Sequence, residues 1–233
     1  MANTGSGGKE LRPYSCSLLV APFFLLLGRK AVMSPRRRDP ELRARRRETL
    51  VKAGYAEILE KGIDGVTLDS VVARADSSKG GALYYFPTKE DLLFAVLDWL
   101  LGQLTQTLDD VVRAAESPRA RLVAQLEVLF HSAEVNRKLY LMLFDYLRIA
   151  TRSDRFRSRL AAFLDDCRRR DVAIIEEGVR SQQFRRVNPE NAAATIRALV
   201  DGYCLQWLMA PEGPPLEVYR DRCRAVLGAY LLR

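Results

Sequence analysis

The pattern of apolar and polar residues predicts a short helix immediately after Thr67. Four apolar residues recur there at the spacing i, i+3, i+4 and i+7, which places them on one side of a helix: Leu68, Val71, Val72 and Ala75. Because Thr67 precedes this run, its hydroxyl can accept a hydrogen bond from a free N–H group of the first turn. We therefore expect Thr67 to cap this helix.

A tight corner and a second short helix follow in the pattern. The corner is centred on Asp76, and Asp is one of the few non-glycine residues that tolerate a left-handed backbone. Ser77 or Ser78 can cap the next helix, residues 79–85, which Pro87 prevents from continuing. The two short helices and their corner outline a helix-turn-helix, a motif whose second helix enters the major groove of DNA.

The flanking helices complete a small domain. Thr88 can cap the helix that follows, with Asp91 three residues on as in a capping box. The helix that precedes the motif, residues 46–61, ends at Gly62, because glycine adopts the left-handed cap without cost. We expect a core made of Leu50, Ala53, Gly54, Ile58, Val66, Leu68, Val71, Val72, Leu83 and Phe86.

In this stretch the chain resembles the TetR family of one-component bacterial transcription regulators. The family pattern includes Ala-Gly-Val-Ser-Lys-Gly, an aromatic pair and Phe-Pro-Ser-Lys-Glu; here residues 75–80 read ADSSKG and residues 86–90 read FPTKE. The likeness is close over about residues 46–97 and holds in outline to the end of the chain. Two positions depart from the pattern, since Asp76 replaces the corner glycine and Ser77 the following apolar residue. The resemblance implies an all-α fold with an N-terminal DNA-binding domain and a C-terminal ligand-binding and dimerisation domain.

The expected domains are a non-native or disordered extension at residues 1–33, a basic arm at 34–45, a helix-turn-helix domain at 46–93 and an effector-binding and dimerisation domain at 94–233. Seven arginines crowd the approach to the first helix: Arg36, Arg37, Arg38, Arg43, Arg45, Arg46 and Arg47. They form either a solvated, partly disordered tail or an arm that lies along DNA phosphates or in the minor groove. Both descriptions can hold in turn, without and with DNA.

The extension contains an apolar run at residues 18–27, broken by Pro22. This run is too short to span a bilayer, which takes about 20 residues. Met33, followed by Ser-Pro and three arginines, is typical of the opening of such a regulator. Our hypothesis is that translation begins at Met33; the alternative is a membrane-associating leader.

The side chains of the second motif helix differ in their expected roles. Ser78 and Lys79 would point toward base edges and phosphates, and the small residues after them would let the backbone approach the groove, with Ala82 touching a thymine methyl. At least one of the two tyrosines should face outward, with its hydroxyl on a phosphate. The predicted DNA-binding residues are Arg45, Arg46, Thr67, Ser78, Lys79, Gly80, Gly81, Ala82, Tyr84, Tyr85 and Lys89.

Beyond the motif the pattern stays helical, over residues 94–115, 119–133, 138–150, 154–178, 189–209 and 215–232. Large residues on the inner faces form either simple core or a ligand pocket: Trp99, Leu126, Phe130, Tyr140, Phe144, Phe163 and Ile174. The last two helices either close this chain's own core or, as the resemblance implies, form a two-fold dimer interface. The predicted interface residues are Ile196, Leu199, Val200, Gly202, Tyr203, Val226, Leu227 and Tyr230.

Composition narrows the classes of function. The formal charge of +8 favours an anionic partner, with nucleic acid the first candidate. The four cysteines have no metal-ligand spacing, which is typical of reduced thiols in a cytoplasmic protein, and His131 is the only histidine. The run Arg168–Arg170 is interpreted as a solvated face. Without a GxSxG, P-loop or HExxH motif we expect no catalytic residue, metal or cofactor, although a helical enzyme is the competing class.

The sequence therefore predicts a cytoplasmic transcriptional regulator: a ligand-responsive repressor that binds a palindromic operator as a homodimer. The expected partners are double-stranded DNA, a second copy of the chain and a small-molecule effector, without stable membrane association. The alternatives are a transcriptional activator of the same architecture and a membrane-associated helical interaction protein.

Overall fold

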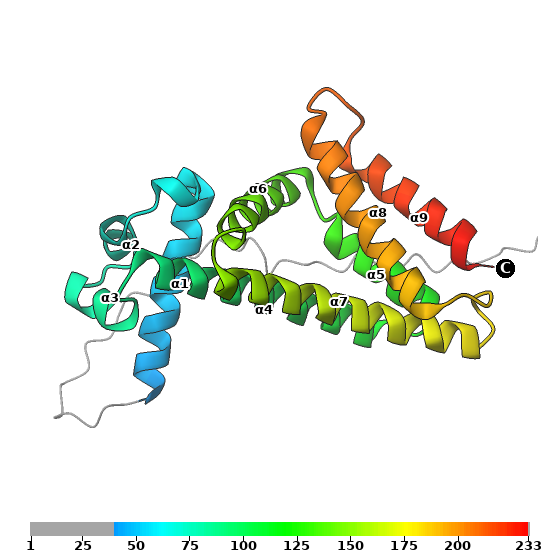
Figure 1. Cartoon of the computed structure of the whole chain (residues 1–233), viewed down its shortest axis with the longest axis horizontal. Coiled ribbons are helices and arrows are strands. Elements are labelled where there is room, and N and C mark those ends of the chain that lie inside the picture. The colour runs from blue at the N-terminus through cyan, green and yellow to red at the C-terminus, as the bar shows by residue number, and fades with distance from the viewer. Residues whose placement is uncertain (1–39, 233) are drawn as a thin grey trace, which may run out of the picture. The chain divides into compact units, whose positions relative to one another are not determined.

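The computed structural model describes residues 40–232, which form nine α-helices and, within that range, no β-strand (Figure 1). The predicted all-α fold is confirmed. The hypothesis of a start at Met33, the apolar run at 18–27 and the arginines at 36–38 lie outside the described residues. Among the helices of residues 40–232, none combines the length and apolar character needed to cross a membrane.

The first four helices build the predicted motif and the helices that flank it: α1 (Pro40–Gly65), α2 (Leu68–Arg74), α3 (Lys79–Tyr85) and α4 (Lys89–Ala114). The predicted start of α1 at Arg46 is wrong, because the helix begins at Pro40 and includes half of the predicted arm. Proline suits a first helical position, and Glu41 in the first turn complements the helix dipole. Gly62 has φ 69°, so it interrupts α1 as the predicted left-handed residue.

Five helices follow: α5 (Pro118–Leu129), α6 (Ala133–Ala150), α7 (Asp154–Arg180), α8 (Pro189–Met209) and α9 (Leu216–Leu231). The predicted bounds of α5 and α6 were wrong by several residues, because the break between them lies at residues 130–132. Ser132 causes this early start of α6, since its hydroxyl accepts a hydrogen bond of 3.3 Å from the N–H of Val135.

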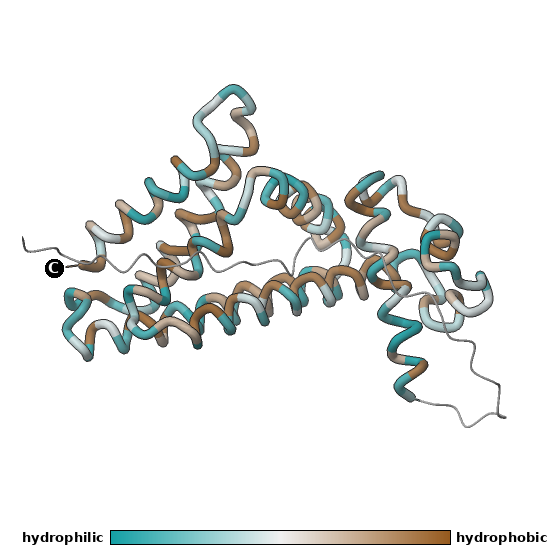
Figure 2. Tube along the Cα trace, turned by 180° about the vertical axis from the view of Figure 1, so that it is seen from behind, coloured by the Kyte–Doolittle hydropathy of each residue, from teal (hydrophilic) through white to brown (hydrophobic). Residues whose placement is uncertain are grey.

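Two hydrophobic cores hold the helices together. The first core is formed by the helices α1, α2, α3, α4 and α6 and the first half of α7. The second core is formed mainly by α5, the second half of α7, α8 and α9. α4 and α7 lie side by side (Figure 1). In the first core, Tyr146 links α6 to α4, because its buried hydroxyl donates a hydrogen bond of 3.0 Å to the carbonyl of Leu93 in α4. Outside the cores, the first turns of α1 are mostly hydrophilic (Figure 2).

Candidate nucleic-acid interface

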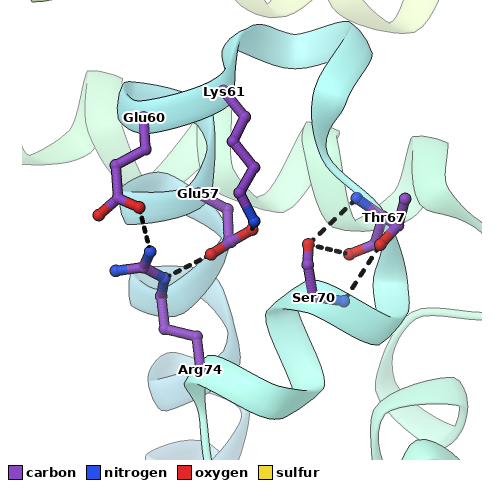
Figure 3. A network of polar contacts seen from close by, with 6 residues as sticks. All are labelled: Glu57, Glu60, Lys61, Thr67, Ser70 and Arg74. Atoms are coloured by element: carbon purple, nitrogen blue, oxygen red, sulfur yellow. Dashed lines mark hydrogen bonds and ion pairs between the residues drawn. The ribbon is translucent and has the colours of Figure 1, made fainter.

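The start of α2 is held by a reciprocal pair of hydrogen bonds. Oγ1 of Thr67 accepts a bond of 3.1 Å from the N–H of Ser70, and Oγ of Ser70 accepts one of 3.3 Å from the N–H of Thr67 (Figure 3). The predicted cap is confirmed. Thr67 remains exposed at the surface, so the hydroxyl that caps the helix lies within reach of a partner.

A buried carboxylate fixes α2 against α1. Glu57 of α1 is 3% exposed, and its two oxygens accept hydrogen bonds of 2.6 Å from Nζ of Lys61 and 2.6 Å from Nε of Arg74 (Figure 3). Arg74 also pairs with Glu60. These bonds lower the pKa of Glu57 to about 2, and the hydrogen bond from Lys61 makes the largest contribution. The sequence offered one signal of this network: Glu57 lies seven residues after Leu50, on the apolar stripe.

The corner and the cap of α3 have the predicted form. Asp76 has φ 47°, the left-handed conformation expected of the corner, and Oγ of Ser78 accepts a hydrogen bond of 3.1 Å from the N–H of Gly81. A Cβ on Gly81 would lie 3.0 Å from that Oγ, whereas a Cβ on Gly80 would have no atom within 4 Å. The absence of a side chain at Gly81 thus serves the cap, while Gly80 leaves open space on the surface.

Two predictions about α3 were wrong: the residue predicted to be exposed is buried, and the residue predicted to be buried is exposed. Ala82, predicted to touch a thymine methyl, is fully buried, and Leu83, predicted to be core, is 41% exposed. The reason is the helical period: Phe86 is buried at 2% exposure, and Ala82, four residues before it, shares its inward face. Leu83 is turned about 100° away from that face.

One of the two tyrosines of α3 faces outward, as predicted. Tyr84 is 62% exposed, and its hydroxyl accepts a hydrogen bond from the guanidinium of Arg43, which also lies 5.2 Å from the centre of the Tyr84 ring. Tyr85 is half-buried, with its ring 5.1 Å from that of Tyr84. Arg43 and Arg47 of α1 line a shallow hollow with both rings. The list of DNA-binding residues omitted both arginines, although the cluster of basic residues pointed to them.

The remaining predicted cations are exposed, and three of them contact other groups of the protein. Lys79 pairs with Asp69 at 2.9 Å, with both side chains more than 60% exposed. Nζ of Lys89 donates a hydrogen bond of 3.1 Å to the carbonyl of Asp64. Arg45 pairs with Glu41 at 3.7 Å, and Arg46 is exposed on the same helix. Exposed ion pairs are weak in water, so phosphates can compete for these side chains.

A narrow cavity lies where the two cores meet, with about 10 Å³ of free volume, close to the minimum that one water molecule needs. Its lining comes from α4, α5, α7, α8 and α9: Leu108, Leu122, Gln125, Leu126, Leu129, Cys167, Asp171, Ile196, Arg197, Val200 and Leu227.

Only Leu126 of the predicted pocket residues lines this cavity. The ring of Trp99 packs edge-on against Tyr55 at 5.2 Å, and Phe163 belongs to the first core. The others pack in the second core: Phe130, Tyr140, Phe144 and Ile174. These large side chains therefore pack as core, the first of the two alternatives, and the cavity is lined mainly by aliphatic and polar side chains.

Asp171 gives the cavity a polar end. It is 5% exposed, and Oδ1 accepts a hydrogen bond of 3.1 Å from the amide of Gln125. Burial, opposed by that bond, raises the pKa of Asp171 to about 6. Sequence reasoning missed this residue, although its place between Cys167 and Ile174 on the apolar stripe of α7 marked it.

Two arginines near Asp171 are already paired. Arg197 binds both oxygens of Asp201, with Nε to Oδ2 at 2.8 Å, and Nη2 of Arg170 lies 2.7 Å from Oδ1 of Asp109. The side chains of Asp109 and Asp201 are 43% and 50% exposed, whereas Asp171 is buried. Asp171 is therefore the buried carboxylate at this end of the cavity, and the neutral amide of Gln125 is its hydrogen-bond donor.

The structure also gives the burial of the arginine run, the histidine and the cysteines. Arg168 and Arg169 are exposed as predicted, but the side chain of Arg170 is only 9% exposed, so the solvated face excludes it. His131 is exposed. The three described cysteines are free and buried: Cys167, Cys204 and Cys223. Across the part of the chain that the structure describes, no three His, Cys, Asp or Glu side chains gather so as to hold a metal ion.

The exposed faces of α8 and α9 differ from the predicted interface. Ile196, Val200 and Leu227 are at most 5% exposed within this chain, so they offer almost no area to a partner. Leu199, Gly202, Tyr203 and Tyr230 are half-buried, and Val226 is 41% exposed. Small and apolar residues that were not predicted are exposed beside them: Ala194, Ala198, Leu205, Met209, Ala225 and Ala229. The predicted stripes were too broad, because each helix is covered on one side by its neighbours.

Two family models match this chain. Residues 50–96 match the model described as bacterial regulatory proteins, tetR family, and residues 118–232 match that described as BetI-type transcriptional repressor, C-terminal. The HTH-type transcriptional regulator BetI of Rhizobium meliloti is 29% identical over 154 residues, which cover 66% of this chain and 75% of that protein. BetI of Burkholderia mallei is 29% identical over 177 residues, which cover 76% and 87%.

Solved structures share the fold. A TetR transcription regulator from Haloarcula marismortui has a TM-score of 0.74 and 26% identity, covering 81% of this chain and 99% of that chain. A transcriptional regulator from Saccharomonospora viridis, solved in complex with choline, has a TM-score of 0.75 and 18% identity, covering 82% and 99%.

Proposed function

We propose that this DNA-binding transcriptional repressor, a chain that belongs to the TetR family, binds its operator as a homodimer and is released from it by a small cationic effector. The observation that carries the proposal is the outward face of α3. There Lys79, Gly80, Leu83 and Tyr84 are exposed on a short helix that Ser78 caps. The neighbouring helices α2 and α4 have their own caps, and the Glu57 network fixes α2.

The exposed faces of α8 and α9 support the dimer. Ala194, Ala198 and Gly202 follow one another on α8 at four-residue spacing, and small residues let two helices approach closely. Leu205 and Met209 continue this face with large apolar side chains that are 44% and 63% exposed. A two-fold pair of chains would bring two copies of α3 to two half-sites, as successive major grooves about 34–36 Å apart require.

The cavity beside Asp171 supports a cationic effector. Its walls are largely aliphatic and its polar end holds the buried carboxylate of Asp171, so an ammonium group with a short apolar portion would have both an apolar wall and an ionic partner there. A related regulator was solved with choline, which has this chemistry. The cavity, at about 10 Å³, is far smaller than such a molecule, so binding must move its walls. An effector that binds only the opened form shifts the equilibrium toward that form.

Helix α6 connects the second core to the helix-turn-helix domain, so it can transmit a movement from one to the other. The amide of Asn136 in α6 lies 3.9 Å from Sγ of Cys204 in α8, and Tyr140 packs in the same core. At the other end of α6, Arg148 binds both oxygens of Asp64, at 2.9 and 2.8 Å. Asp64 lies two residues after Gly62, which interrupts α1. A tilt of α6 would therefore be transmitted to the motif and change the spacing of the two copies of α3.

The test is a selection of bound fragments from the source genome, followed by footprinting and sedimentation of the complex. We expect a palindromic site that is protected by two chains, and a reporter gene that the protein silences. Titration with choline, a primary amine and a carboxylate of similar size should release DNA with the cations only. Protein that protects no DNA would refute the proposal; release by the carboxylate alone would refute the effector class.

A further inference from the structure

The outward face of α3, which is proposed to enter the major groove, has few side chains that can form hydrogen bonds with bases. The helix has the sequence KGGALYY, so it contains no Arg, Asn or Gln, the residues that bind a purine edge in bidentate fashion. Lys79 is its only cation, and the hydroxyl of Tyr84 is held by Arg43. Apart from a contact of Lys79 with guanine, discrimination between bases by this helix depends on another kind of contact.

Leu83 supplies an apolar group on that face. It is 41% exposed, whereas Ala82 and Phe86 beside it are buried, so its side chain is directed away from the core. Gly80 lies one turn before Leu83 on the helix surface, and a Cβ built on Gly80 meets no atom within 4 Å. The space next to the Leu83 side chain is open, and a base edge can enter it.

We infer that Leu83 is a specificity-determining residue, which reads the C5 methyl group of a thymine in each half-site. The thymine methyl is the apolar group that B-DNA presents in the major groove, and it is absent from the other three bases. The inference rests on the proposed function, because it requires α3 to enter the major groove. It assigns to Leu83 the contact that the sequence pattern had suggested for Ala82, which is buried.

Thymine-to-deoxyuridine exchange tests the contact directly, because it removes the methyl group and nothing else. In the selected operator, each thymine is replaced in both half-sites at once, and the dissociation constant is measured by fluorescence anisotropy. One position should weaken the wild-type protein about 15-fold, or about fourfold for each half-site, as one buried methyl group at about 0.8 kcal/mol requires. The other positions should have smaller effects.

The variant Leu83→Ala should bind the thymine operator more weakly and lose its sensitivity to deoxyuridine at that one position. Leu141→Ala is the matched control, since Leu141 is 50% exposed on α6, away from α3. It should retain the wild-type profile. Thermal unfolding should be unchanged for both variants, because both side chains are exposed.

Two results would overturn the inference while leaving the repressor assignment intact: a wild-type protein that is insensitive to deoxyuridine at every position, or a Leu83→Ala variant with the full wild-type penalty. A protein that selects no DNA would instead refute the proposed function, and the inference with it.

Discussion

Nε of Arg74 in α2 donates a hydrogen bond of 2.6 Å to the buried carboxylate of Glu57 in α1, which Lys61 also binds at 2.6 Å. This bond joins the first short helix of the motif to the long helix beneath it. The side chain of Glu57 is 4% exposed and that of Arg74 is 33% exposed, so the carboxylate is shielded from solvent and the guanidinium partly so. It contributes to the position of α2, and through the corner at Asp76 to that of α3.

Glu57→Gln should destabilise the domain at pH 7 by about 2 kcal/mol, because it leaves Arg74 and Lys61 without their carboxylate. The folded-state pKa of Glu57 is lowered from 4.5 to about 2. Its contribution is therefore present above about pH 4.5 and is lost as the pH falls toward 2. Urea unfolding at pH 7 and pH 2.5 should show a smaller difference between variant and wild type at the lower pH.

Glu48→Gln is the control for this series, since Glu48 pairs with Lys52 on the same helix with both side chains 51% exposed. Its effect should stay below about 0.5 kcal/mol. A loss for Glu57→Gln that is equal at the two pH values would contradict the ionic role.

Asp171→Asn should make the protein more stable at pH 8, by about 1–3 kcal/mol, and by about half as much at pH 5. The folded-state pKa of Asp171 is raised from 3.8 to about 6, so its protonated form stabilises the folded chain fully below about pH 3.8, and that contribution is lost as the pH rises through 6. Paired Arg170 and Arg197 nearby reduce the effect. Melting temperatures from pH 5 to pH 8 measure it.

Asp165→Asn serves as the comparison, because Asp165 pairs with Arg168 at the surface of the same helix. Its melting temperature should follow the wild type across the pH range. If Asp171→Asn lowered the melting temperature equally at pH 5 and pH 8, the carboxylate would be a hydrogen-bond acceptor only.

Gly80→Gln should raise stability and weaken DNA binding at the same time. Glutamine is a better helix former than glycine by about 0.5–1 kcal/mol, and the new side chain meets no atom within 4 Å of its Cβ. On DNA the same side chain occupies the space that a base edge needs, so we expect affinity to fall at least tenfold. Denaturation and gel-shift assays give the two readouts.

Gly81→Ala tests whether the two neighbouring glycines, Gly80 and Gly81, have different roles. Its Cβ would lie 3.0 Å from Oγ of Ser78 and disturb the cap of α3, which offsets the gain in helix propensity. Stability should not rise as it does for Gly80→Gln. If Gly80→Gln bound DNA as tightly as the wild type, α3 would not enter a groove.

Gly178→Ala should destabilise the second core by about 1–3 kcal/mol. A Cβ on Gly178 would lie 2.1 Å from the Cδ2 of Phe184, whose ring is 1% exposed and cannot move into solvent without loss of packing. Gly102→Ala, in open space on α4, should instead stabilise the protein by about 1 kcal/mol. Thermal unfolding of the two variants should shift in opposite directions; equal shifts would contradict the clash.

Lys89→Ala should weaken DNA binding for all sequences alike. Lys89 begins α4, where helix N–H groups favour a phosphate, and its bond to the carbonyl of Asp64 is exposed. The logarithmic salt dependence of binding should become shallower by about one unit for each half-site. Lys138→Ala, on α6, should leave the slope unchanged, and an unchanged slope for Lys89→Ala would show that this lysine touches no phosphate.

Much of the DNA-binding unit was predictable because its signals are local. A threonine or serine before an apolar period, an aspartate at a corner and a proline after a short helix act through the backbone within a few residues. The bounds of α2 and α3, the caps at Thr67 and Ser78 and the conformation of Asp76 followed from these signals. The start of α1 at Pro40 was missed, because a run of arginines is compatible with both helix and coil.

The sequence by itself determined which segments are helices, how the motif is capped and, by its likeness to known regulators, what class of protein this is. Only the tertiary structure decided which face of each helix is covered. It turned Leu83 outward and Ala82 inward, placed Asp171 in a cavity and took Ile196, Val200 and Leu227 away from the predicted interface. The physical reason is that a helical period identifies an apolar stripe to within about one residue, while the neighbouring helices that cover it come from distant parts of the chain.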